Sequence, residues 1–131
     1  MNTPVSFEIA KLLKEKGYNF YHRMSYWKSE LTDHTPGYAL EDGTTSQDNY
    51  LDFERYYAPT IAEVVMWLYE KHGVWLHATM SFKEFSPYIQ CDWNYRQDNI
   101  KDVLEFMKQM YNSPTEAYTA AIEYTLTKLI K

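Results

Sequence analysis

The feature of this sequence that most constrains its fold is a change of hydrophobic period around Gly73. Over residues 59–72 the apolar side chains recur every three or four positions, which predicts an amphipathic helix. Its predicted buried face, widened by Met66 and Trp67, consists of Ile61, Val64, Val65, Leu68 and Tyr69. Over residues 74–80 apolar side chains alternate with Trp75 and His77, which predicts a strand with one buried face. Each element has one apolar face to bury, and a layer of helices packed on a sheet buries both faces at once.

Further segments extend this pattern along the chain. Residues 85–93 should pair with residues 74–80 as an antiparallel hairpin, and the aromatic segment 18–27 should join the same sheet. Pro87 has no N–H to donate, so the second strand should lie at a sheet edge or be bulged there. We expect an α+β fold in which three to four helices form one layer on a small, mainly antiparallel sheet. The predicted helices are residues 5–16, 59–72, 99–111 and 113–130.

Two helix starts are marked by their side chains. Thr60 and Glu63 match a capping box, in which each side chain accepts a hydrogen bond from the other residue's backbone N–H. Pro59 also suits a first helical position, so the sequence leaves a choice of about one residue for this start. Ser113 and Pro114 match an N-cap followed by a proline in the first turn.

The chain has 131 residues, and we expect a single domain spanning residues 1–131. Within it, residues 28–57 are rich in turn-forming residues and should be an acidic, irregular insertion. The stretch 30–54 holds seven Asp and Glu and no Lys or Arg, whereas the whole chain has a net charge of −5. The plain interpretation is an acidic surface loop, and the alternative is a loop that steers a basic partner.

Composition narrows the classes of partner. Basic residues are scattered along the chain, unlike the clustered pattern of a nucleic-acid binder. No apolar run approaches the roughly 18 residues of a membrane span, and the N-terminus lacks a signal-peptide pattern. The single cysteine, Cys91, cannot form an internal disulfide. We therefore expect a cytoplasmic protein with no nucleic-acid or membrane partner.

The sequence shows no known spacing for metal, phosphate or nucleophile chemistry. His72 should cap a helix C-terminus as a partly cationic imidazole, whereas His77 belongs to the following strand. There is no C-x-x-C or H-E-x-x-H motif, and the four glycines are too dispersed for a phosphate-binding loop. Cys91 shares an apolar strand face with Ile89, which favours a buried, inert thiol. We expect no metal site and no cofactor.

One acid–base pair stays open as an enzymatic alternative. His77 and Asp92 lie on the predicted hairpin and would serve a small hydrolase or lyase if their side chains met in a pocket. The plainer interpretation is a polar, water-facing sheet surface. We favour that interpretation because none of the motifs searched for supports catalysis.

Aromatic residues make up 18 % of the chain, which is more than one modest core absorbs. Rings outside a core are favoured at binding surfaces because they bury much area with few rotatable bonds. If the sheet face away from the helices is open, we expect a non-enzymatic binding module that docks a protein partner or self-associates. If a helix or the 28–57 segment covers that face, the rings belong to the core. The candidate binding residues are Trp75, His77, Tyr88, Tyr21 and Arg23.

Three stretches of the chain are distinctive as strings. They are VSFEIAKLLKEKG at 5–17, APTIAEVVMWLYEKHGVWL at 58–76 and YNSPTEAYTAAIEYTL at 111–126. They resemble a recurring group of small uncharacterised proteins from Bacteroidales genomes and their phages or mobile elements. The resemblance implies a shared small α+β scaffold and a mobile-element origin. It carries over no catalytic residues, because no activity is known for the group.

Overall fold

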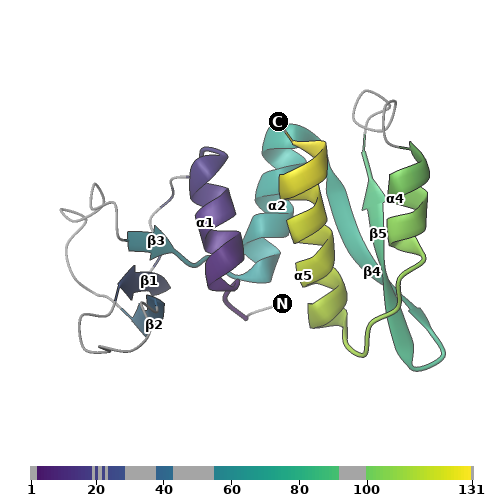
Figure 1. Cartoon of the computed structure of the whole chain (residues 1–131), viewed down its shortest axis with the longest axis horizontal. Coiled ribbons are helices and arrows are strands. Elements are labelled where there is room, and N and C mark those ends of the chain that lie inside the picture. Colours follow the sequence, from purple (N-terminus) through teal and green to yellow (C-terminus); the bar gives the residue numbers. More distant parts are fainter. Residues whose placement is uncertain are drawn as a thin grey trace. The chain divides into compact units, whose positions relative to one another are not determined.

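The computed structural model describes residues 3–18, 20, 22, 24–28, 38–42, 55–91 and 100–130. Contacts divide the chain into two compact units, one of Pro4–Pro59 and one of Thr60–Lys131 together with Met1–Thr3. Helices and antiparallel strands occur in both units, which confirms the predicted α+β class (Figure 1).

The first unit combines one helix with a three-stranded antiparallel sheet of order β2-β1-β3. Ser6 caps the helix by accepting a hydrogen bond from the Ile9 N–H. The Tyr26 hydroxyl donates to the Val5 carbonyl at 2.7 Å, which ties the middle strand to the segment before the helix. The elements are α1 Phe7–Glu15, β1 Met24–Lys28, β2 Tyr38–Asp42 and β3 Arg55–Tyr57.

Two sequence predictions about this unit are wrong. The sequence predicts that residues 18–27 join the sheet of the 74–80 hairpin, but β1 pairs with β2 and β3 instead. The sequence also predicts an irregular segment over residues 28–57, yet β2 and β3 lie within it. Both strands are short and contain charged residues, so neither has the alternation that would reveal a partner. Residues 29–37 and 43–54 of that segment lie outside the described residues.

The second unit is built on a two-stranded antiparallel hairpin, β4 and β5. Helix α5 lies along this hairpin and continues into a π-helical turn, η2 (Figure 1). Helix α2 packs against β4 and α5, and helix α4 packs against β5. The elements are α2 Ile61–His72, β4 Trp75–Ser81, β5 Glu84–Gln90, α4 Ile100–Met107, α5 Pro114–Tyr124 and η2 Thr125–Leu129.

One face of the hairpin is at the centre of this unit's core. Leu76 and Ile89 lie opposite each other on the two strands, and both are fully buried. Ala117 and Ala121 of α5 are also fully buried, and their small side chains let the helix come close to the strands. The alternation in the sequence therefore identified the buried face of β4 correctly.

Side-chain caps decide where the helices of this unit begin. The Thr60 side chain accepts from the Glu63 N–H, and the Glu63 carboxylate accepts from the Thr60 N–H at 3.0 Å. The predicted capping box is confirmed, and it excludes a start at Pro59. Gly73 ends α2 with a positive φ of 68°, and Ser113 caps α5.

Three residues of β5 have backbone groups that point away from β4, and none of the three presents an N–H without a hydrogen-bond partner. Pro87 has no N–H, so Pro87 and Ala78 form a non-hydrogen-bonded pair across the hairpin. The two kinds of pair alternate along the strands, so the backbone groups of Phe85 and Ile89 also point away from β4. The Phe85 N–H donates to the Tyr111 carbonyl at 2.8 Å, and the Ile89 N–H donates to Met107 Sδ at 3.4 Å. The predicted edge position of Pro87 is confirmed.

A two-residue loop, Phe82 and Lys83, closes the hairpin. Phe82 has a positive φ of 57°, as the first residue of such a tight loop needs in order to follow the twist of the strands. An aromatic residue is uncommon there because its Cβ crowds the backbone, which costs about 1–2 kcal/mol.

The two faces of β4 should respond differently to truncation. We expect Leu76→Ala to lower the free energy of unfolding by about 3 kcal/mol, because it leaves a cavity in the core. Thr79→Ala, on the exposed face of the same strand, should change it by less than about 1 kcal/mol. Urea denaturation followed by circular dichroism measures both variants. Equal losses would contradict the assignment of the two faces.

Phe82 should be replaceable without a loss in the free energy of unfolding. We expect Phe82→Asn to keep or raise the free energy of unfolding, by up to about 1 kcal/mol, because Asn tolerates a positive φ. Phe82→Val is the matched control and should lower it, since β-branched residues are least tolerant of this conformation. The same denaturation experiment measures both. A less stable Phe82→Asn protein would show that the ring supports the fold.

Candidate functional site

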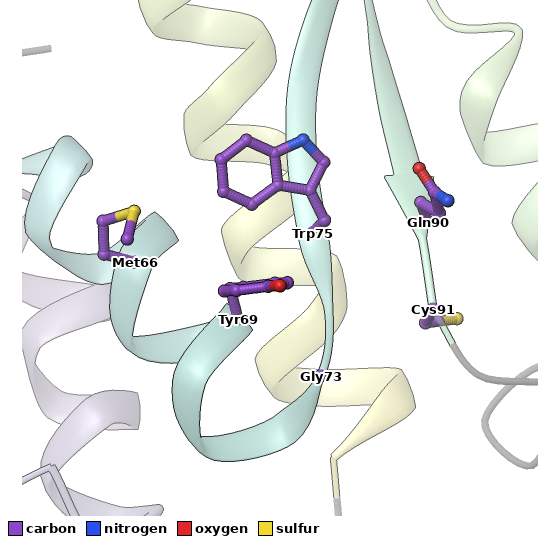
Figure 2. A pocket seen from close by; sticks show the side chains of 6 residues that line it. All are labelled: Met66, Tyr69, Gly73, Trp75, Gln90 and Cys91. Atoms are coloured by element: carbon purple, nitrogen blue, oxygen red, sulfur yellow. The ribbon is translucent and has the colours of Figure 1, made fainter.

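A pocket of about 720 Å³ lies in the second unit, beside the C-terminal half of α2 and the start of β4. Figure 2 shows the indole of Trp75 projecting from β4 toward α2, where Tyr69 and Met66 are. None of the lining side chains is an acid or a base of the Asp, Glu, Lys, Arg or His type, so the pocket suits an uncharged group. The lining residues are Met66, Tyr69, Gly73, Trp75, Gln90 and Cys91.

Local structure places these side chains. Val64 and Leu68 are buried on the face of α2 that packs in the core. Met66 and Tyr69 lie outside that face, one helical turn apart. Gly73 ends the helix in the left-handed conformation, and β4 begins two residues later. The strand alternation then puts Trp75 on the face opposite the buried one.

The pocket wall is apolar and accessible. Met66 is 45 % exposed, Tyr69 is 53 % exposed and Trp75 is 36 % exposed. The rings of Tyr69 and Trp75 meet edge to face, with centroids 5.5 Å apart and planes at 80°. This arrangement is a favoured one for two aromatic rings, so each ring limits the movement of the other.

Trp75, His77 and Tyr88, three of the predicted binding residues, lie on the same face of the hairpin. His77 and Tyr88 are directly opposite on the two strands, and their rings stack with centroids 4.6 Å apart and planes at 23°. Tyr88 is 38 % exposed and His77 is half-buried. We call Met66, Tyr69, Trp75, His77 and Tyr88 the aromatic face.

Three other predicted residues cannot be placed on this face. Tyr21, Arg23 and Asp92 lie outside the described residues, so their roles stay predictions. The same holds for the His77–Asp92 pair. Within the described part of the chain, the contact found for the His77 ring is its stack on Tyr88.

Two residues of the pocket lie elsewhere than the sequence predicts. The periodicity predicts Tyr69 on the buried face of α2, but this residue is exposed, whereas Trp67 is buried. The strand pattern also predicts a buried Cys91, which is half-buried and lines the pocket because β5 has already ended at Gln90. One signal was available: Met66 and Trp67 extend the apolar residues of this helix beyond one face, so the stripe is wider than the face that the core covers.

His72 lies at the C-terminus of α2 as predicted, but its surroundings disfavour the partly cationic imidazole that the sequence predicts. Its Nε2 atom is buried and has no hydrogen-bond partner among the described residues, and its ring meets Trp67 edge to face at 5.0 Å. Burial lowers the pKa of His72, and the neighbouring Lys71 lowers it further. The neutral imidazole is therefore the favoured form in the folded protein.

The described residues contain no group of three His, Cys, Asp or Glu side chains that could hold a metal ion. No helix in the described ranges is long and apolar enough to cross a membrane. No protein-family model, curated protein or solved structure matches the chain. The uncharged pocket and the aromatic face are therefore the features on which a functional proposal can be built.

The lowered pKa of His72 predicts a pH dependence of stability. Below about pH 6.5 an unfolded chain takes up a proton at His72 that the folded protein binds only at lower pH. Protonation then favours the unfolded state, so stability should fall as the pH drops from about 6.5 toward the lowered pKa. His72→Gln should reduce this slope in melting temperatures measured between pH 7.5 and pH 5. An unchanged slope would contradict the assignment to His72.

Proposed function

We propose that this protein is a small binding module whose pocket receives an uncharged apolar or aromatic side chain of a protein partner or of a second copy. The observation that carries the proposal is the pocket itself, about 720 Å³ and lined by Met66, Tyr69 and Trp75. These large apolar side chains stay accessible, so a bound side chain removes apolar surface from water on both molecules.

The apolar lining of the pocket supports a side-chain anchor. Burying one large apolar side chain contributes roughly 1.5–3 kcal/mol, which is enough for an anchor but not for a complete interface. The neighbouring His77 and Tyr88 extend the surface with a stacked pair, and rigid rings lose little conformational entropy on binding. The aromatic face thus provides a pocket for an anchoring side chain and a flat surface around it.

The single cysteine supports the cytoplasm as the proposed location. The acidic stretch 30–54 supports a basic region on the partner.

The proposal can be tested by selecting peptides from a displayed random library on the immobilised full-length chain. We expect the enriched peptides to share an aromatic or aliphatic anchor. Trp75→Ala should weaken their binding about 30-fold or more, as truncation of a central anchor does. Leu104→Ala, which truncates an exposed apolar residue of α4, is the matched control and should leave binding unchanged.

Circular dichroism would show whether each variant is folded. No enrichment, or peptides that bind folded Trp75→Ala as tightly as the unchanged chain, would overturn the proposal.

A further inference from the structure

The outer edge of β4 carries unpaired backbone groups. Ala78 and Met80 lie opposite Pro87 and Phe85, in pairs whose backbone N–H and C=O groups point away from the hairpin. No hydrogen bond to the backbone of Ala78 or Met80 is found within the described ranges. Met80 is 67 % exposed and Ala78 is half-buried, so another molecule can reach both residues.

The accessible part of this edge is short. Leu76 lies opposite Ile89 in the same kind of pair, so its backbone groups also point outward. Leu76 is fully buried, however, which shows that the edge is covered at this point. A strand added to β4 can therefore pair with Ala78 and Met80, but not farther back toward the start of β4.

Strand β4 lacks the usual protection of a sheet edge. Natural edges are protected by charges, prolines or bulges, and β4 (WLHATMS) has no proline and no acidic, lysine or arginine residue. The whole chain has a net charge of −5, yet residues 73–82 contain no Asp, Glu, Lys or Arg. Two copies can therefore meet along β4 without bringing like charges together.

One antiparallel register uses the accessible residues of both copies. With Thr79 of each copy at a two-fold axis, Ala78 of one copy pairs with Met80 of the other, and the reverse. Every outward N–H and C=O of these residues then has a partner in the second copy. A shift by two residues in one direction brings in the covered Leu76. A shift in the other direction brings in Phe82, whose positive φ ends the strand.

The side chains of β4 complement themselves in this register. On the face that carries Thr79, the Thr79 residues of the two copies face each other, and His77 of one copy faces Ser81 of the other. Pairs of Thr and Ser hydroxyls across strands are favourable, and both Thr79 and Ser81 are exposed. On the other face, the exposed Met80 of one copy lies beside Ala78 of the second and loses contact with water. No other sequence is needed to complete the pairing.

We infer that two copies of this chain form a symmetric dimer by antiparallel pairing of their β4 strands, with Thr79 at the two-fold axis. The dimer has a four-stranded sheet of order β5-β4-β4-β5. Because two residues of each strand make the pairing, self-association should be weak and depend on concentration. The dimer uses the edge of β4 and not the pocket, so the inference does not rest on the proposed function.

Amide hydrogen exchange of the full-length chain, followed by NMR at rising concentration, tests the pairing residue by residue. We expect the N–H groups of Ala78 and Met80 to exchange more slowly as the concentration rises, because they gain carbonyl partners only in the dimer. The N–H groups of His77 and Thr79 are bonded within the hairpin and are the internal control. Unchanged exchange at Ala78 and Met80 up to about 1 mM protein overturns the inference.

Sedimentation at the same concentrations separates the role of the backbone from that of the side chain. Met80→Pro removes an outward N–H from each copy without removing a hydrogen bond of the hairpin. We expect it to weaken self-association about 10-fold or more, since a carbonyl of each partner is left unpaired. Met80→Ala is the matched control: it loses the same side chain, keeps the N–H and should associate more strongly than Met80→Pro. Equal association of the two variants, both folded by circular dichroism, overturns the inference.

Charges at residue 79 test the register on an exposed position that the monomer tolerates. Thr79→Lys and Thr79→Glu each place two like charges at the axis, so each variant alone should associate more weakly than the unchanged chain. An equal mixture should associate more strongly than either variant, because opposite charges then face each other. A mixture that associates no more strongly overturns the inference, because residue 79 then does not face its own copy.

The outcomes separate this inference from the proposed function. Trp75→Ala should leave self-association unchanged, and Met80→Pro should leave peptide binding to the pocket unchanged. A dimer that is lost in Trp75→Ala and kept in Met80→Pro places the second copy in the pocket, which overturns the inference and leaves the proposed function standing. A monomeric chain whose Ala78 and Met80 amides are protected only by a selected peptide also overturns it, because the edge then binds another protein.

Discussion

A two-stranded hairpin is only marginally stable alone in water, so the second unit depends on covering one face of β4 and β5. Leu76 and Ile89 at the centre of that face are fully buried, with Ala117 and Ala121 of α5 buried beside them. Helix α5 packs against both strands, whereas α4 packs against β5 and α2 against β4. On the other face of the hairpin, Trp75 and Tyr88 stay partly exposed.

The face of the hairpin opposite Leu76 and Ile89 carries aromatic rings. His77 and Tyr88 stack across the strands, and Trp75 meets Tyr69 of α2 edge to face. Ring pairs of this kind give an accessible apolar surface a defined shape without burying it. The short passage from helix to strand at Gly73 brings α2 close enough to form one wall of the pocket.

The two edges of the hairpin differ in the hydrogen bonds that their backbone groups make. On β5, Pro87 removes one donor, and Tyr111 and Met107 accept from the two others. On β4, the outward groups of Ala78 and Met80 have no such partner in the described structure. Among the described residues, the edge of β4 is therefore less protected than that of β5.

The sequence by itself determined the features that depend on local order along the chain. The capping box of Thr60 and Glu63 fixed the start of α2, and the alternation around Leu76 identified the buried face of β4. The same alternation put Trp75 and His77 on one face of β4, and the hairpin pairing predicted from the sequence added Tyr88 to that face. These features depend on residues near each other in the chain, so periodicity and capping chemistry are enough to find them.

Tertiary structure decided which distant segments meet. It paired β1 with β2 and β3 rather than with the hairpin, because short strands of mixed polarity carry no record of their partner. It also exposed Tyr69, which the helix stripe had assigned to the core, and made it a wall of the pocket. On a helix that is apolar on more than one side, only packing against β4 and α5 determines which side stays open.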